Sequence, residues 1–182
     1  YGYLYGYGKK KKEAEGKGEG ETQASIDLMP HTHPRSVVAE ACRAFRTSLL
    51  LSRAGGVQMI VVTSAFAREG KTTTAVNLAA SLAAAEQRTL LVDGDPQGNA
   101  SSGIGLVRDE IGETVYDVLL DASRIEGAIV HGVQFKHLDV LPATPDLAGA
   151  EIELVSEDER ELAMRRGLER VRDQYDYILI DC

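Results

Sequence analysis

The sequence predicts an α/β fold, a doubly wound and mostly parallel sheet with helices on both faces. Three β-branched apolar runs indicate strands, at 58–63, 89–92 and 177–181. The run at 89–92 is continuously apolar, as in a strand of a buried parallel sheet. Stretches with helical periodicity separate the three runs, and strands that alternate with helices are typical of a parallel sheet.

The length of 182 residues suits one domain with a tail. We expect the domain over 30–182 and expect it to be truncated at its C-terminal end, because the last apolar run stops close to Cys182. Residues 1–29 are expected to form a disordered tail rich in Tyr, Lys, Glu and Gly. Few apolar side chains lie there to offset the entropy of ordering.

Composition narrows the class of protein. The formal net charge is −8, which argues against sequence-independent binding of DNA or membranes by the domain as a whole. Two distant cysteines, Cys42 and Cys182, fit a reduced cytosolic interior better than a disulfide framework, so we expect a cytoplasmic protein. No apolar run approaches the ~20 residues of a membrane-spanning helix, and no signal peptide is visible.

Prolines, an N-cap residue and helical spacing predict the first two elements, a turn and a helix. The segment 30–34, bounded by two prolines, is predicted to be a rigid turn. Ser36 is the expected N-cap of a helix over 37–53, which the glycine pair at 55–56 ends. Apolar residues of this helix share one face: Val38, Cys42, Phe45, Leu49 and Leu50. Charged residues on the other side form either a solvated stripe or a contact surface between subunits: Glu40, Arg43 and Arg46.

The predicted strand 58–63 leads through a loop into Gly70-Lys71-Thr72, where an alanine-rich helix to about residue 86 begins. This is the layout of a phosphate-binding P-loop, in which backbone N–H groups and a helix N-terminus face an anion. Lys71 would reach the β- and γ-phosphates of a nucleotide, and the Thr72 hydroxyl would bind Mg²⁺. Of the usual G-x-x-x-x-G-K-[ST] pattern only the first glycine is missing, since Ala65 stands there. The expected nucleotide-binding residues are Ala67, Arg68, Glu69, Gly70, Lys71, Thr72 and Thr73.

The remaining elements alternate as a parallel sheet requires. The strand 89–92 ends in Asp93-Gly94-Asp95, and 100–108 is predicted to be a loop. The later elements are expected to be helices at 114–120 and 125–130, a strand at 138–142, helices at 146–154 and 157–172, and the strand 177–181.

Three aspartates follow predicted strands and meet the P-loop at one edge of the sheet, because the carboxyl ends of parallel strands lie together. Bare carboxylates would repel a nucleotide, so their presence indicates a metal ion, and Mg²⁺ binds few carboxylates and keeps several waters. We therefore expect Thr72, Asp93 and Asp181 to hold Mg²⁺, directly or through water. Lys71 and Asp95 are the expected catalytic residues, with Asp95 orienting or deprotonating the attacking group. Ordinary strand-end caps, and a turn with a surface lysine, are the alternatives.

From Ala84 to its end the chain resembles the ParA/Soj and MinD-type partition ATPases. The matching stretches are 91–103, 114–119, 138–143, 146–155 and 175–182, the first of them beginning Leu91-Val92-Asp93-Gly94-Asp95-Pro96-Gln97-Gly98-Asn99. The resemblance implies a P-loop NTPase that dimerises on ATP, binds DNA non-specifically and is stimulated by a ParB-type partner. It also implies that Asp95 is the hydrolytic aspartate and Asp181 the Walker B aspartate.

The stretch 31–84 is instead similar to bacterial tyrosine kinases of the exopolysaccharide type. Their Glu-x-x-Arg-x-x-Arg helix, used for ring assembly, is matched by Glu40, Arg43 and Arg46, and their loop is matched by 63–72. The second lysine of partition ATPases is replaced, with its glycines, by Phe66, Ala67 and Arg68. The alternating tyrosines are either part of a low-complexity tail or phosphate acceptors: Tyr1, Tyr3, Tyr5 and Tyr7.

The function expected from these observations is binding and hydrolysis of Mg-ATP, as an ATP-dependent switch in chromosome or plasmid partitioning. A protein-tyrosine autokinase of capsule or exopolysaccharide synthesis is one alternative. A catalytically weak interaction module is another. A homo-oligomer is expected in the enzyme cases, a dimer for a partition ATPase and a ring for a kinase.

Overall fold

The computed structural model describes residues 28–52, 58–65, 69–156 and 159–182. The predicted tail therefore lies almost wholly outside the described residues, as does the glycine pair at 55–56. Within the described ranges, no helix combines the length and the apolar character that crossing a membrane would require.

Four parallel strands form a single sheet in the order β1-β4-β2-β3. Their bounds are Gln58–Val62 for β1, Thr89–Asp93 for β2, Leu138–Leu141 for β3 and Tyr177–Asp181 for β4. Each agrees with a predicted strand to within one residue. The prediction of a doubly wound parallel α/β sheet is thus confirmed.

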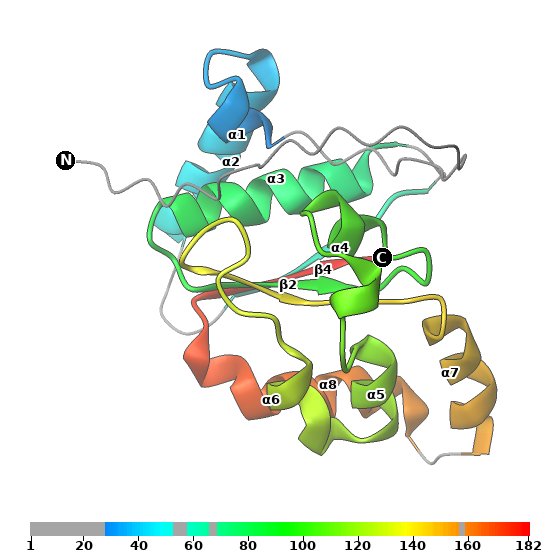
Figure 1. Cartoon of the computed structure of the whole chain (residues 1–182). Coiled ribbons are helices and arrows are strands. Elements are labelled where there is room, and N and C mark those ends of the chain that lie inside the picture. Colours follow the sequence, from blue (N-terminus) through cyan, green and yellow to red (C-terminus); the bar gives the residue numbers. More distant parts are fainter. Residues whose placement is uncertain (1–27, 53–57, 66–68, 157–158) are drawn as a thin grey trace, which may run out of the picture.

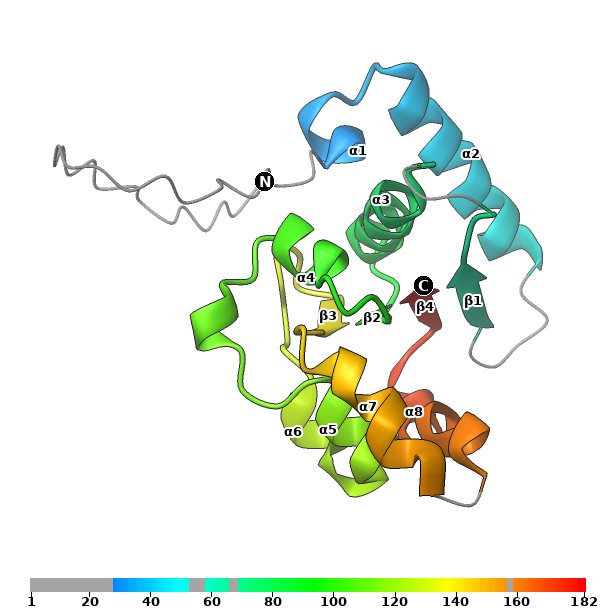
Figure 2. The same cartoon turned by 90° about the vertical axis from the view of Figure 1, so that its right-hand side faces the viewer.

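Helices cover the sheet in two layers (Figures 1 and 2). The upper layer in Figure 1 holds α1 (Met29–Thr32), α2 (Val37–Ser52), α3 (Lys71–Ala84) and α4 (Asn99–Gly103). The lower layer holds α5 (Val115–Leu120), α6 (Ile125–Ala128), α7 (Leu147–Glu153) and α8 (Ala163–Val171). One-turn 3₁₀ helices lie at Arg108–Glu110, Ala122–Arg124, Leu154–Ser156, Arg160–Leu162 and Arg172–Gln174.

The core divides into one apolar cluster on each face of the sheet. Along β2, Leu91 packs into the upper cluster with α3, while Leu90 and Val92 pack into the lower cluster with α5 and α8. This alternation follows from the two-residue period of a strand. Helix α3 is buried continuously from Ala75 to Ala83, because its small side chains allow a close approach to the sheet.

Strand β1 differs from the other strands because one of its faces is exposed. Ile60 and Val62 pack against the upper cluster, but Met59 is 43% exposed and Val61 58% exposed. β1 is an edge strand in the sheet order, and the lower helices do not bury its second face. The apolar run 58–63 thus correctly predicted a strand, and the place of β1 at the edge of the sheet explains its exposed face.

Helix α2 begins as predicted, since the Ser36 hydroxyl accepts a hydrogen bond of 3.1 Å from the Ala39 N–H. Its predicted apolar face is only partly correct. Val38 and Phe45 are each 46% exposed, while Leu49 and Leu50 pack against the upper cluster. The helix lies against α1 and α3, and Ala39 is its one buried residue.

The charged side of α2 is also different from the predicted stripe. Glu40 and Arg43 form an exposed ion pair of 2.6 Å. Arg46 is half-buried and points to α3, where its Nη1 lies 3.4 Å from the Ser81 carbonyl oxygen and 3.5 Å from the Ser81 hydroxyl. Within this chain Arg46 therefore joins two helices, and the three charged side chains do not share one solvated face.

Three further predictions need correction. The proline-bounded segment 30–34 begins as helix α1, because Pro30 stands in the first turn, where no backbone N–H is required. The segment 100–108 starts as helix α4, which begins after Gly98 in a left-handed conformation. The predicted helix 157–172 is regular only as α8, from Ala163, after a 3₁₀ turn.

Candidate nucleotide-binding site

The end of the P-loop has the backbone geometry of an anion site. Gly70 is the N-cap of α3 with φ +80°, a left-handed conformation that glycine adopts without strain. Its carbonyl accepts hydrogen bonds of 2.9 Å from both the N–H and the hydroxyl of Thr74. The N–H groups of the first helical turn have no carbonyl partner within the helix, so they can face an anion together with the positive end of the helix dipole.

The strand register brings Asp181 into the centre of this edge. Asp181 is the last residue of β4 and lies in register between Val62 of β1 and Asp93 of β2. Its backbone carbonyl accepts a hydrogen bond of 2.7 Å from the Gly94 N–H. A Cβ atom at Gly94 would lie 2.7 Å from the same carbonyl oxygen, so glycine is needed where these two strands separate.

The Asp181 side chain is buried without a hydrogen-bond partner. It has no exposed surface, and neither carboxylate oxygen accepts a hydrogen bond from any described residue. Burial raises the pKa of this carboxyl group, although the Thr72 hydroxyl and the Lys71 ammonium group are near enough to oppose the rise. Such an orphaned acceptor, beside a threonine hydroxyl and a lysine, fits the donor set of a bound divalent cation.

The Asp93 side chain is also fully buried, but both of its carboxylate oxygens accept hydrogen bonds. Oδ1 accepts a hydrogen bond of 3.1 Å from the Asp95 N–H. Oδ2 accepts one of 2.8 Å from the Ser101 N–H and one of 2.7 Å from the Ser101 hydroxyl. Burial raises the pKa of Asp93 more than these donors lower it, and the nearby Asp181 adds to the rise.

Asp95 organises the turn that follows β2. Its Oδ1 accepts a hydrogen bond of 2.9 Å from the Gln97 N–H, and its Oδ2 one of 2.9 Å from the Asn99 side-chain amide. Its carbonyl accepts a hydrogen bond of 2.8 Å from the Gly98 N–H. The charge of Asp95 acts on the pKa of Asp181, so the turn lies at the same sheet edge as the P-loop.

The structure thus brings most of the predicted site residues together. Lys71, Thr72, Asp93, Asp95 and Asp181 share one edge of the sheet, and Gly70 with Thr73 lies in the helix start beside them. Glu69 is exposed just before this start. Ala67 and Arg68 lie outside the described residues. Their roles in binding and catalysis remain predictions.

Across the part of the chain that the structure describes, no three His, Cys, Asp or Glu side chains converge as a ligand group. Thr72 and Asp181 would hold a Mg²⁺ ion together with phosphate oxygens and water, which suits the preference of this ion.

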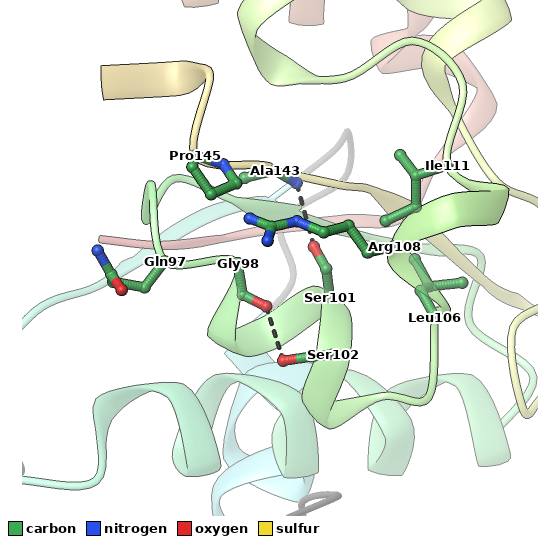
Figure 3. A pocket seen from close by; sticks show the side chains of 9 residues that line it. All are labelled: Gln97, Gly98, Ser101, Ser102, Leu106, Arg108, Ile111, Ala143 and Pro145. Carbon is green, nitrogen blue, oxygen red and sulfur yellow. Dashed lines mark hydrogen bonds between the residues drawn. The ribbon is translucent and has the colours of Figure 1, made fainter. Parts of the chain in front are cut away.

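A pocket of about 220 Å³ lies beside the Asp95 turn, between α4 and the loop that follows β3 (Figure 3). Its lining includes two residues that the sequence did not single out, Ser101 and Arg108. No local pattern could have found Ser101, because its partners are Asp93, eight residues away, and Ala143, 42 residues away.

Comparison with known proteins agrees with this geometry. Residues 57–182 match a family model described as "AAA domain" (AAA_31). The chain belongs to this family. The matched range includes β1, the P-loop and all three aspartates of the site.

Two curated relatives of this AAA-domain chain are named for partitioning or sporulation control. The chromosome partitioning protein ParA of Myxococcus xanthus is 57% identical over 113 residues, which cover 62% of this chain and 40% of that protein. The sporulation initiation inhibitor protein Soj of Bacillus subtilis is 49% identical over 125 residues, which cover 69% of this chain and 49% of that protein. The chain therefore spans less than half the length of these relatives.

Solved structures support the fold of the AAA domain. Cobyrinic acid a,c-diamide synthase from Mycobacterium smegmatis, with bound ATP analog and magnesium, matches with a TM-score of 0.65 and 34% identity over 69% of this chain and 51% of its own. The kinase domain of the Escherichia coli tyrosine kinase ETK matches with a TM-score of 0.67 over 87% of this chain and 59% of its own. At 23% identity the kinase shows the shared fold alone. Both predicted resemblances, to partition ATPases and to the kinase fold, are thus confirmed.

Proposed function

We propose that this AAA-domain protein binds and hydrolyses Mg-ATP and acts in the cytoplasm as an ATP-dependent switch in chromosome or plasmid partitioning, like its ParA and Soj relatives. The observation that supports the proposal most is the buried Asp181 carboxylate, which accepts no hydrogen bond from any described residue and lies near Thr72 and Lys71. A buried anion without partners is costly unless a ligand completes its surroundings. A Mg²⁺ ion with a nucleotide would do so.

The site residues then have distinct roles in nucleotide binding and hydrolysis. The N–H groups at the start of α3 bind the phosphates, and the Lys71 ammonium group reaches the β- and γ-phosphates. The Thr72 hydroxyl and the Asp181 carboxylate hold the metal. Asp93, the third predicted metal residue, reaches it through water, because its carboxylate already accepts three hydrogen bonds. The metal supplies neutralisation of charge on the phosphate oxygens. Asp95 orients the attacking water, as its place at the sheet edge allows.

Turnover of ATP tests the catalytic assignment. Asp95→Ala is expected to lower kcat by at least 100-fold, a typical contribution of a positioned acid or base, with binding of Mg-ATP kept. Asp173→Ala is the matched control, because Asp173 is an exposed aspartate at the opposite end of β4. Absence of turnover in the unmodified protein, or full turnover in Asp95→Ala, would contradict the proposal.

Binding to DNA tests the partitioning role. We expect ATP-loaded protein to form a dimer and to shift duplex DNA in a gel, and we expect the shift to weaken steeply with salt because phosphate contacts release counterions. Addition of a ParB-type partner is expected to accelerate ATP turnover. Failure to shift DNA at low salt in the presence of ATP would leave an ATPase without a partitioning role.

A tyrosine kinase is the second candidate, favoured by the Glu-x-x-Arg-x-x-Arg pattern on α2 and by the tyrosines at positions 1–7. It predicts a ring-shaped oligomer through Glu40, Arg43 and Arg46. It also predicts phosphate on the tyrosines after incubation with Mg-ATP, abolished by Lys71→Met. Mass spectrometry that finds only unmodified peptides would remove this candidate. An inactive interaction module would show no turnover at all, and its Asp95→Ala variant would behave as the unmodified protein does.

A further inference from the structure

Ser101 makes an unusual set of contacts for a residue outside the predicted site. It lies in α4 and is 2% exposed. Its N–H and its hydroxyl both donate to Oδ2 of Asp93, over 2.8 and 2.7 Å. A carboxylate that accepts two such bonds in a buried place is held far more firmly than one that faces water.

The same hydroxyl also connects two strands. The Ala143 N–H donates to the Ser101 hydroxyl over 3.1 Å, a contact visible as a dashed line in Figure 3. Ala143 follows β3, whereas Asp93 ends β2. Gly98 confirms how closely these segments meet, because a Cβ atom there would lie 2.9 Å from the Ala143 carbonyl oxygen. Ser101 thus joins the exits of β2 and β3.

The other oxygen of Asp93 extends the connection to the hydrolytic turn. Oδ1 of Asp93 accepts a hydrogen bond from the Asp95 N–H. The Asp95 carboxylate in turn accepts hydrogen bonds from the Gln97 N–H and the Asn99 side-chain amide. A continuous series of hydrogen bonds therefore leads from Ala143 through Ser101 and Asp93 to Asp95. The series starts at Ala143, just after β3, and ends at Asp95, the residue assigned to the attacking water.

We propose that Ser101 is a positioning residue for ATP hydrolysis, which holds Asp95 in place through Asp93 and Ala143. This inference rests on the proposed function for its catalytic meaning. Ser101 does not touch the reacting atoms, and its effect reaches them only through the turn. Loss of its hydroxyl should loosen the turn and slow hydrolysis, while the P-loop at the start of α3 keeps its hold on the nucleotide.

The neighbouring serine provides a matched control. The Ser102 hydroxyl donates only to carbonyl oxygens of its own helix start, Gly98 at 2.8 Å and Asn99 at 3.4 Å. Such local bonds contribute little to a helix. Ser101→Ala and Ser102→Ala therefore remove the same atom from adjacent positions of one helix, and only the first disconnects Asp93 from β3.

Amide hydrogen exchange of the whole protein without nucleotide tests the connection independently of activity. In Ser101→Ala we expect the amides of 94–99 to exchange at least tenfold faster, while those of α3 are unchanged. Ser102→Ala should match the unmodified protein in both regions. Exchange in 94–99 that is unaffected by Ser101→Ala would overturn the inference, whether or not the protein hydrolyses ATP.

Steady-state kinetics test the catalytic meaning. Ser101→Ala should lower kcat about tenfold and leave KM for Mg-ATP within about twofold, since ground-state binding is kept. Ser101→Thr, which retains the hydroxyl, should restore most of kcat, and Ser102→Ala should not change it. Faster amide exchange of 94–99 in Ser101→Ala together with an unchanged kcat would overturn the positioning role.

Two outcomes separate this inference from the proposed function. If the unmodified protein lacks ATP turnover, the proposed function fails, and hydrogen exchange alone still decides whether Ser101 holds the turn. If Ser101→Ala does not fold, Ser101→Cys replaces it, because a thiol has a similar shape and is a weaker donor and acceptor. Exchange in 94–99 and kcat of Ser101→Cys should then lie between those of the unmodified protein and the values expected for Ser101→Ala, and values equal to those of the unmodified protein would overturn the inference.

Discussion

At the scale of single residues, two aspartates of the site have similar sequence positions, each at the end of a strand, but different hydrogen bonding. Asp93 and Asp181 end neighbouring strands in the same register and both have no exposed surface. The carboxylate of Asp93 accepts three hydrogen bonds from described residues, and that of Asp181 accepts none. The protein therefore supplies hydrogen-bond donors to one carboxylate, and none of the described residues supplies them to the other.

This contrast predicts opposite effects of the same substitution. Asp93→Asn should lower the free energy of unfolding by about 2 kcal/mol, since an amide N–H₂ would replace an acceptor that Ser101 and Asp95 require. Asp181→Asn should leave the nucleotide-free protein as stable or more stable, because it removes the charge of a buried carboxylate that accepts no hydrogen bond from the described residues and whose burial outweighs the nearby Lys71. Unfolding in urea without nucleotide measures both values.

Mg-ATP should affect the stability of the two variants differently. Mg-ATP should raise the Tm of Asp93→Asn but not that of Asp181→Asn, because a ligand stabilises only a protein that binds it. Equal losses of stability for the two variants in the absence of nucleotide would show that the Asp181 carboxylate has partners that the structure lacks.

At the scale of elements, helix starts show how local sequence can determine structure. Helix α5 begins with a capping box. The Thr114 hydroxyl accepts a hydrogen bond from the Tyr116 N–H over 3.2 Å, and the Asp117 carboxylate accepts one from the Thr114 N–H over 2.8 Å. Two backbone donors are thus satisfied reciprocally, and the predicted helix 114–120 is confirmed.

The cap makes a prediction of stability. Thr114→Ala should lower the free energy of unfolding by about 1 kcal/mol, the usual cost of losing an N-cap. Thr47→Ala is the matched control, because the exposed Thr47 hydroxyl only bonds back to the Arg43 carbonyl oxygen within α2. Thermal or urea unfolding of the two variants checks the difference. Equal effects would mean that the capping box does not stabilise the domain.

At the scale of the whole molecule, side chains also join the strands at the end opposite the site. The Tyr175 hydroxyl, just before β4, donates to Asp139 of β3 over 2.9 Å, and Asp139 also contacts the His131 ring over 2.8 Å. Tyr175 is 5% exposed. Burial, and then the charge of Asp139, raise the pKa of Tyr175 well above its ordinary value.

This tyrosine predicts a loss of stability in alkali. Because its pKa is higher in the folded than in the unfolded chain, its contribution is complete below about pH 10 and is lost as the pH rises further. Tyr175→Phe should therefore be about 2 kcal/mol less stable than the unmodified protein at pH 8, and the difference should shrink at pH 11. Unfolding in urea at the two pH values measures it.

Tyr116→Phe is the control for this comparison, since the exposed Tyr116 hydroxyl donates to Glu153 over 2.8 Å on the surface. Its stability should remain close to that of the unmodified protein at pH 8. A gap between Tyr175→Phe and the unmodified protein that widens toward pH 11 would contradict the sign of the shift.

The sequence by itself determined the strands, the P-loop and the three aspartates, because these depend on local patterns of apolar residues and on residues at strand ends. It also determined the cap at Ser36, whose partner lies three residues away. The sequence alone did not predict the contacts between distant segments. The exposed face of β1, the turn of Arg46 toward α3 and the bonds of Ser101 to Asp93 and Ala143 depend on which elements become neighbours, and only the tertiary structure decided them.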